Sequence, residues 1–203
     1  LDPDTSELHF ALGNLFRRRG DFERAIRVHE HLLARADLSN EDRYRARHAL
    51  ALDFLKAGLL DRAEENLRQL TDTPLAGQAL LALLSIYERS RDWAHAGEVA
   101  QLLGRQGEAR FEVRLAHYLC EQAASLPQDQ WHEKQALLER ACAVAPRSAR
   151  PPLAWADLVE ERGDLTSAFE RRWKVAETMP TFVPLLAAGL TRLAMRLGRT
   201  AEV

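Results

Sequence analysis

Apolar side chains recur every three or four residues through most of the chain, which is the spacing of one face of an α-helix. In residues 7–16 this spacing places Leu8, Leu12, Leu15 and Phe16 on one stripe. No stretch shows the apolar–polar alternation that a half-buried strand requires. The pattern predicts an all-α chain with essentially no sheet.

Three stretches share one outline: RRRGDFERAIRVHEHLL at 17–33, KAGLLDRAEENLRQL at 56–70 and EERGDLTSAFERRW at 160–173. Each places a glycine five residues before an alanine, in the pairs Gly20 and Ala25, Gly58 and Ala63, and Gly163 and Ala168. The glycine permits a left-handed residue at the end of one helix, and the alanine lets the next helix approach closely. We therefore expect helix pairs that repeat along the chain.

The alanine position recurs at Ala96, and Lys134 occupies the equivalent position between Ala96 and Ala168. The intervals scatter around the roughly 34-residue period of the tetratricopeptide repeat. A lone helix pair cannot cover its apolar stripe, so successive pairs stack. We predict one tetratricopeptide superhelix of antiparallel helix pairs, five to six units spanning residues 1–203, with approximate divisions at 1–38, 39–73, 74–106, 107–146, 147–180 and a partial 181–203.

Several positions are predicted to define the packing and the ends of the helices. The packing positions are Leu12, Gly13, Phe16, Gly20, Ala25, Phe54, Gly58, Ala63, Tyr87, Ala96, Gly163 and Ala168. Asp21, Asp92 and Asp164 stand where an N-cap would begin the second helix of a pair. Thr73 and Pro74 have the order expected of an N-cap and a first-turn proline.

Composition narrows the function classes. Hydrophobic residues make up 46% and charged residues 29% of the chain, as in ordinary soluble proteins, and the formal net charge is -2. This charge argues against a nucleic-acid partner, including an RNA-binding helical repeat, which would need a basic groove. Two cysteines are too few for a disulfide scaffold and indicate a reducing compartment. No apolar run approaches the roughly 18 residues of a membrane span, and the chain opens without methionine, so we expect a piece of a longer protein.

No group of residues predicts catalysis. His29 and His31 lie two residues apart and point to different faces of a helix, and His117 with Cys120 supplies only two metal ligands. The nucleotide, metalloprotease, hydrolase and paired CxxC motifs are absent. We expect no enzyme activity, no cofactor and no metal in this chain, with Cys120 and Cys142 packed as small hydrophobic residues.

The concave face, lined by the first helix of each pair, is the candidate binding surface. Its predicted residues are Phe10, Asn14, Arg17, Arg45, His48, Leu52, Lys56, Gln78, Leu81, Ser85 and Arg89. Cations, amides and leucines together suit an acidic, amphipathic peptide. The alternative is that these residues only solvate the groove. The irregular fourth unit, with a longer loop around Pro127, is a second place where a partner could dock.

Four stretches of the sequence are more specific than a tetratricopeptide repeat requires. The stretches ALGNLFRRRGDFERAIRVHEHLL, AGLLDRAEENLRQLTD, RLAHYLCEQA and RSARPPLAWADLVEERGD resemble the lipopolysaccharide assembly protein B family, tetratricopeptide proteins of the Gram-negative inner membrane. The resemblance runs along nearly all of residues 1–203. It implies an N-terminal membrane anchor, a cytoplasmic repeat region and a C-terminal rubredoxin-like zinc module with paired CxxC motifs, which Cys120 and Cys142 do not match.

The resemblance also implies a function and partners. Such a protein is an adaptor that brings the deacetylase of lipid A synthesis to a membrane-bound ATP-dependent metalloprotease, with other inner-membrane lipopolysaccharide proteins as further partners. The alternative from the repeat alone is a generic interaction scaffold or assembly chaperone with another client. Terminal units without polar caps would expose Leu185, Leu186 and Leu190, so we also consider a homo-oligomer.

Overall fold

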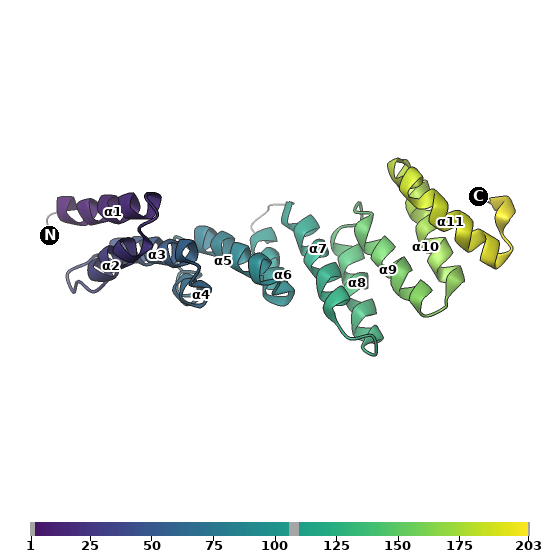
Figure 1. Ribbon diagram of the computed structural model, residues 1–203, viewed down its shortest axis with the longest axis horizontal. Helices are drawn as coiled ribbons and strands as arrows, with labels where there is room; N and C mark the ends of the chain where they lie inside the picture. Colours follow the sequence, from purple (N-terminus) through teal and green to yellow (C-terminus); the bar gives the residue numbers. More distant parts are fainter. Residues whose placement is uncertain (1–2, 106–109, 203) are drawn as a thin grey trace. The chain divides into compact units, whose positions relative to one another are not determined.

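The computed structural model describes residues 3–105 and 110–202 (Figure 1). Every regular element within these ranges is helical and none is a strand, so the all-α prediction is confirmed. Two compact units divide the chain, residues 1–92 and residues 93–203. The division falls inside the predicted unit 74–106, and a single array over the whole chain stays a prediction.

Both units are built from helices joined by short turns. The first unit contains α1 (Pro3–Arg18), α2 (Phe22–Leu33), α3 (Asn40–Ala57), α4 (Leu60–Arg68) and α5 (Ala76–Ser90). The second contains α6 (Trp93–Gly104), α7 (Arg110–Ser125), α8 (Trp131–Val144), α9 (Arg150–Glu161), α10 (Leu165–Thr178) and α11 (Val183–Leu197), with short 3-10 turns at Pro180–Phe182 and Thr200–Glu202.

One turn geometry ends five of these helices. After α1, Gly20 has φ 79°, the amide of Asp21 donates to the carbonyl of Phe16 at 3.0 Å, and the amide of Gly20 donates to Arg17 at 3.1 Å. This is the Schellman motif, which pairs carbonyls that the end of a helix leaves unsatisfied. The hydrogen bond equivalent to that from Asp21 to Phe16 recurs in four more turns, from Leu59 to Phe54, Asp92 to Tyr87, Asp164 to Val159 and Arg199 to Ala194. The left-handed residue in these turns is Gly58, Arg91, Gly163 and Gly198 respectively.

The residue after the turn starts the next helix. The carboxylates of Asp21 and Asp164 accept from the amides of Arg24 and Ser167, three residues on, as N-caps. Thr73 differs from its predicted role, because α5 begins at Ala76 after Leu75. The Thr73 hydroxyl instead donates to the carbonyl of Leu70 and accepts from the amide of Leu75, so it shapes the turn that precedes the helix.

The first unit buries a different face of α1 from the one predicted. Leu8, Leu12 and Leu15 are 66%, 39% and 49% exposed, so the packing role expected of Leu12 is wrong. The buried stripe is Ser6, Phe10 and Gly13, because α2 and α3 pack on that side of α1. A side chain at Gly13 would place its Cβ 2.4 Å from the ring of His29, so only glycine lets α2 come this close.

The second unit has its own core around α10 and α11. Ala168, Phe169, Val175, Leu186, Leu190, Leu193 and Ala194 are buried in it together with Ala149. Leu186 and Leu190 are therefore not exposed, which corrects the expectation made for them. Leu185 alone of that trio faces solvent, at 73% exposure, and self-association through it stays a prediction.

The turn constraint predicts opposite effects for two alanine substitutions in the second unit. An added Cβ meets nothing within 4 Å at either Gly163 or Gly189, so only backbone conformation separates them. Gly163 has φ 84°, and Gly163→Ala should lower the free energy of unfolding by about 1–2 kcal/mol. Gly189 lies inside α11, and Gly189→Ala should raise it by about 0.5–1 kcal/mol. Urea denaturation measures both, and changes of the same sign would contradict the constraint.

Candidate functional site

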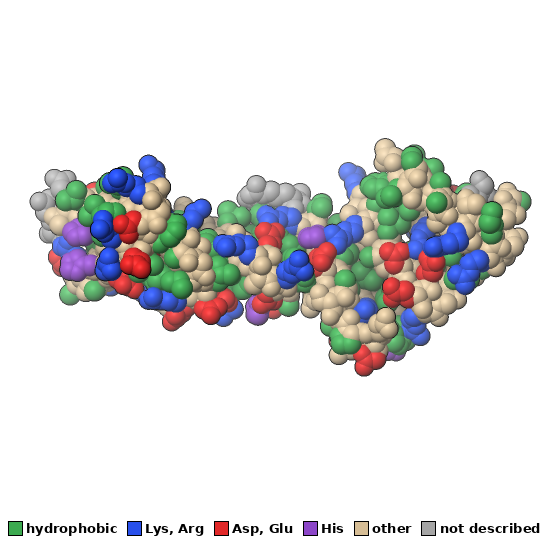
Figure 2. Space-filling model, viewed as in Figure 1, with side chains coloured by type: hydrophobic (Ala, Val, Ile, Leu, Met, Phe, Trp, Pro, Cys, Tyr) green, Lys and Arg blue, Asp and Glu red, His purple; other side chains and the backbone are tan. Residues whose placement is uncertain are grey.

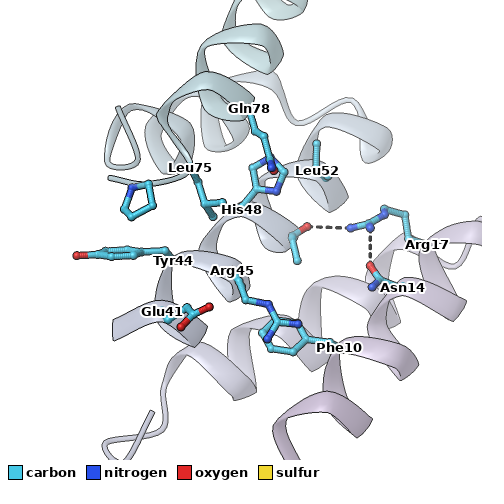
Figure 3. Close-up of a pocket in the computed structure, with 12 residues that line it drawn as sticks. Phe10, Asn14, Arg17, Glu41, Tyr44, Arg45, His48, Leu52, Leu75 and Gln78 are labelled. Atoms are coloured by element: carbon cyan, nitrogen blue, oxygen red, sulfur yellow. Dashed lines mark hydrogen bonds between the residues drawn. The ribbon is translucent and has the colours of Figure 1, made fainter. Parts of the chain in front are cut away.

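A cavity of about 720 Å³ opens in the first unit among α1, α3 and the start of α5 (Figure 3). Its lining residues are Phe10, Asn14, Arg17, Glu41, Tyr44, Arg45, His48, Ala49, Leu52, Pro74, Leu75 and Gln78. The odd-numbered helices of this unit thus supply the walls, as the sequence predicts for first helices of each pair. This size is within the range of cavities that bind small ligands or a few side chains of a partner.

A buried carboxylate fixes one wall. Asp53 on α3 is fully buried and accepts from Arg17 on α1 at 3.0 Å, while its other oxygen lies 2.5 Å from Nδ1 of His29 on α2. Arg17 also donates to the carbonyl of Ala49 at 3.1 Å and to the side-chain oxygen of Asn14 at 2.5 Å (Figure 3). Arg17 therefore joins α1 to α3, and Asp53 extends the network to α2 through His29.

A second arginine is also paired. Arg45 donates to Glu7 at 2.7 Å and to Asp42 at 3.0 Å, and the bond to Glu7 is the main reason why the pKa of Arg45 is raised. Its guanidinium lies 4.4 Å from the centroid of the Phe10 ring. Figure 3 shows the two side chains next to each other. Phe10 itself is buried against Leu32, Leu38 and Ala46, so it is a core residue with one edge on the cavity.

These pairs change the charge expected of the cavity. Burial, and then the charge of Arg17, lower the pKa of His48, so its imidazole is neutral at pH 7. Arg17 and Arg45 are each paired with carboxylates. Glu41 is the remaining charged residue of the lining, and its charge is negative. Figure 2 shows the same mixing on the face it presents, where cationic and anionic side chains of the first unit lie beside one another. An acidic ligand thus gains less here than the sequence suggests.

The remaining polar groups suit a peptide instead. The Asn14 oxygen accepts from Arg17, which leaves the amide nitrogen of Asn14 to donate to a ligand. Gln78, Tyr44 and His48 offer further hydrogen bonds beside the apolar Leu52 and Leu75 (Figure 3). This arrangement can hold an extended backbone with one apolar side chain.

Seven of the predicted groove residues thus line the cavity, and Lys56, Leu81, Ser85 and Arg89 do not. Lys56 and Arg89 are exposed in the last turns of α3 and α5, and Leu81 is 43% exposed. Sequence reasoning missed Tyr44, which lies one turn before His48 on α3 and could have been found from that spacing. It also missed Leu75, because the loop that brings it to the cavity is irregular.

The cysteines show no reactive environment. Cys120 is buried on α7, and burial raises the pKa of its thiol to about 11. Burial likewise raises the pKa of Cys142 on α8. No group of three or more metal-ligating side chains occurs among the described residues. Across those same ranges, no helix combines the length and apolarity needed to cross a bilayer.

The helix pairs and their turns give this chain the tetratricopeptide-repeat fold. Residues 8–44 match the tetratricopeptide repeat family. Solved structures share the fold, among them MamA 41-end from Desulfovibrio magneticus RS-1, with a TM-score of 0.51 at 15% identity over 89% of this chain and 98% of that one. A tetratricopeptide repeat protein from Parabacteroides merdae has a TM-score of 0.51 at 16% identity, over 98% of this chain and 76% of that chain.

The resemblance in sequence is confirmed over the whole length. The chain is 36% identical to lipopolysaccharide assembly protein B of Escherichia coli K12 over 99% of its residues, and 34% identical to the Haemophilus influenzae protein of that name over 87%. These alignments cover 52% and 45% of the two relatives, so the chain spans about half the length of the curated relatives it matches.

The buried carboxylate predicts a large loss of stability on its removal. Asp53→Ala would leave the guanidinium of Arg17, itself only 19% exposed, and the ring of His29 without their shared partner. We expect the free energy of unfolding to fall by about 3–5 kcal/mol in urea denaturation. Glu7→Ala removes an exposed partner of Arg45 and should cost at most about 1 kcal/mol. Equal small losses in the two variants would show that Asp53 does not hold the helices together.

Proposed function

We propose that this chain is the repeat scaffold of a non-enzymatic adaptor in lipopolysaccharide synthesis. The adaptor brings the deacetylase of the lipid A pathway to a membrane-bound ATP-dependent metalloprotease, which degrades it. The observation that supports this most is the 36% identity to lipopolysaccharide assembly protein B along 99% of the chain. The proposal gives the chain no cofactor and no nucleic-acid ligand, and it places the whole protein on the cytoplasmic side of the inner membrane.

Tethering explains how such a scaffold acts without chemistry. Two partners held on one protein meet at an effective concentration that reaches the millimolar range when geometry permits. A weak encounter between enzyme and protease then becomes productive. The first-unit cavity supplies a place for one partner, because it offers hydrogen bonds to a peptide backbone and an apolar floor at Leu52 and Leu75.

The lifetime of the deacetylase in cells tests this function. Depletion of the whole protein should lengthen that lifetime severalfold, because the substrate no longer reaches its protease. The double variant Leu52→Asp with Gln78→Glu, made in the whole protein, should lengthen it as well, since both residues line the cavity without joining the Asp53 network. Leu102→Asp is the matched control, being 45% exposed on α6 and outside that cavity. Pulse-chase labelling gives the half-life.

Two outcomes would contradict the proposal at different levels. An unchanged half-life on depletion means that the protein is not this adaptor, and a scaffold with another client would replace the proposal. A longer half-life on depletion, combined with a normal one in the double variant, would keep the adaptor and move its binding site away from the cavity.

A further inference from the structure

A second cavity, of about 640 Å³, lies wholly within the second unit. It is formed by the end of α8, the loop that follows, the first turns of α9 and one face of α10. Its lining residues are Cys142, Ala145, Pro146, Arg147, Ser148, Pro152, Trp155, Arg171, Lys174, Val175, Thr178 and Met179. The first-unit cavity is lined mainly by the first helices of the pairs, whereas this cavity is lined mainly by α10 and the loop after α8. No residue predicted for the groove lines it.

The charge of this cavity is of one sign. Arg147, Arg171 and Lys174 line it, and none of its lining residues is Asp or Glu. None of these three cations makes an ion pair with a described residue, unlike Arg17 and Arg45 in the first unit. Asp164 is close enough to Arg171 to feel its charge, but its carboxylate caps α10 through the amide of Ser167 at 3.0 Å. The positive charge is therefore available to a ligand.

Stacking fixes the plane of the Arg171 guanidinium in a way that suits a planar anion. Its Cζ lies 3.6 Å from the centroid of the Trp155 ring, so the group stacks on the indole. Stacking occupies the face of a guanidinium and leaves the N–H donors at its edge in one plane, which matches two oxygens of a carboxylate. Nε of Arg171 is buried and has no hydrogen-bond partner among the described residues. Since Nε is covered, a carboxylate seated beside Trp155 would accept from the Nη groups of Arg171, which make no ion pair with a described residue.

Apart from Ser148 and Thr178, the rest of the cavity is lined by apolar side chains and Cys142, and a second cavity adjoins it at the loop. Trp155, Val175 and Met179 form an apolar wall next to the cations. A neighbouring cavity of about 620 Å³ shares Ala145, Pro146, Arg147 and Ser148 with it. This second cavity adds the exposed Val113 and Phe182, and one carboxylate, Glu112. A single inorganic anion would fill neither the apolar wall nor the second cavity. An extended chain that alternates carboxylates with apolar side chains could contact both.

We propose that this second-unit cavity binds an acidic peptide segment of a partner protein, with a carboxylate on Arg171 and a large apolar side chain against Trp155. Arg147 and Lys174 at the rim add attraction for flanking acidic residues. The proposal rests on the adaptor function in one respect, that the peptide belongs to a protein partner. It assigns the acidic ligand to this cavity, since the cations of the first-unit cavity are already neutralised.

Fluorescence anisotropy with the 203-residue chain tests the proposal. The probe is a capped, labelled octapeptide of alternating Glu and Leu, and the comparison peptide carries Gln in place of Glu. We expect the acidic probe to bind and the Gln peptide to bind at least about tenfold more weakly, since charge-assisted hydrogen bonds are lost. Inorganic phosphate and phosphatidylglycerol vesicles are competitors that distinguish a phosphate or lipid site from a peptide site.

Variants locate the binding. Arg171→Gln should weaken the acidic probe by at least about tenfold, and Arg171→Lys should recover part of this loss because charge returns without the planar donors. Lys174→Gln, at an exposed residue that leaves the fold intact, should weaken it severalfold. Arg196→Gln removes the same charge from an exposed residue outside both cavities and should leave affinity unchanged. Thermal melting by circular dichroism confirms that each variant is folded.

Three results would overturn the proposal. They are no binding of the acidic probe, equal weakening by Arg171→Gln and Arg196→Gln, or binding of phosphate or vesicles with no binding of the peptide. Each of them leaves the lifetime of the deacetylase on depletion untouched, so the cavity can fail while the adaptor function stands.

Discussion

Close approach of paired helices at one small residue is the constraint on which the rest of the structure depends. Ala25, Ala63, Ala96 and Ala168 are completely buried, and each is the fourth residue of its helix. A larger side chain there would push the partner helix away and open the core. Lys134 is the fourth residue of α8, and it lines a cavity of about 190 Å³ that lies among α7, α8 and α9. The left-handed turn and the alanine thus act together. The turn sets where the first helix ends and the chain reverses, and the alanine sets how closely the second helix packs against the first.

Close packing brings polar groups into the interior, where they must be satisfied. At Gly13 the backbone of α1 comes so near to α2 that His29 lies fully buried against it, and Asp53 reaches both His29 and Arg17. A buried carboxylate without these partners would be strongly unfavourable. The same network holds Arg17 and Asn14 in place on the wall of the first-unit cavity. The stability of this unit and the shape of its cavity therefore have one physical origin.

The two cavities differ in what they have left to offer. In the first-unit cavity Arg17 and Arg45 are paired within the fold, and the groups that remain are amides, a neutral imidazole, the Tyr44 hydroxyl, the Glu41 carboxylate and apolar side chains. In the second unit Arg171 stacks on Trp155 and keeps donors unused. Arginines are thus paired with carboxylates in the first-unit cavity and left without ion pairs among the described residues in the second. The adaptor function proposed above would need surfaces with different chemistry, because one kind of surface would attract two copies of the same partner.

The sequence alone determined the helices, their turns and the repeat, because each depends on neighbours within one or two turns: Gly20 and Gly163 permit the left-handed residue, and Ala25 fits the close approach. The helical period in the sequence also correctly grouped seven predicted groove residues, which line one cavity. Only the tertiary structure decided which stripe of α1 is buried and which cations are free. Arg17 meets Asp53 across 36 residues of sequence, and the energy of such a pair depends on distance and burial, which exist only once the helices have packed.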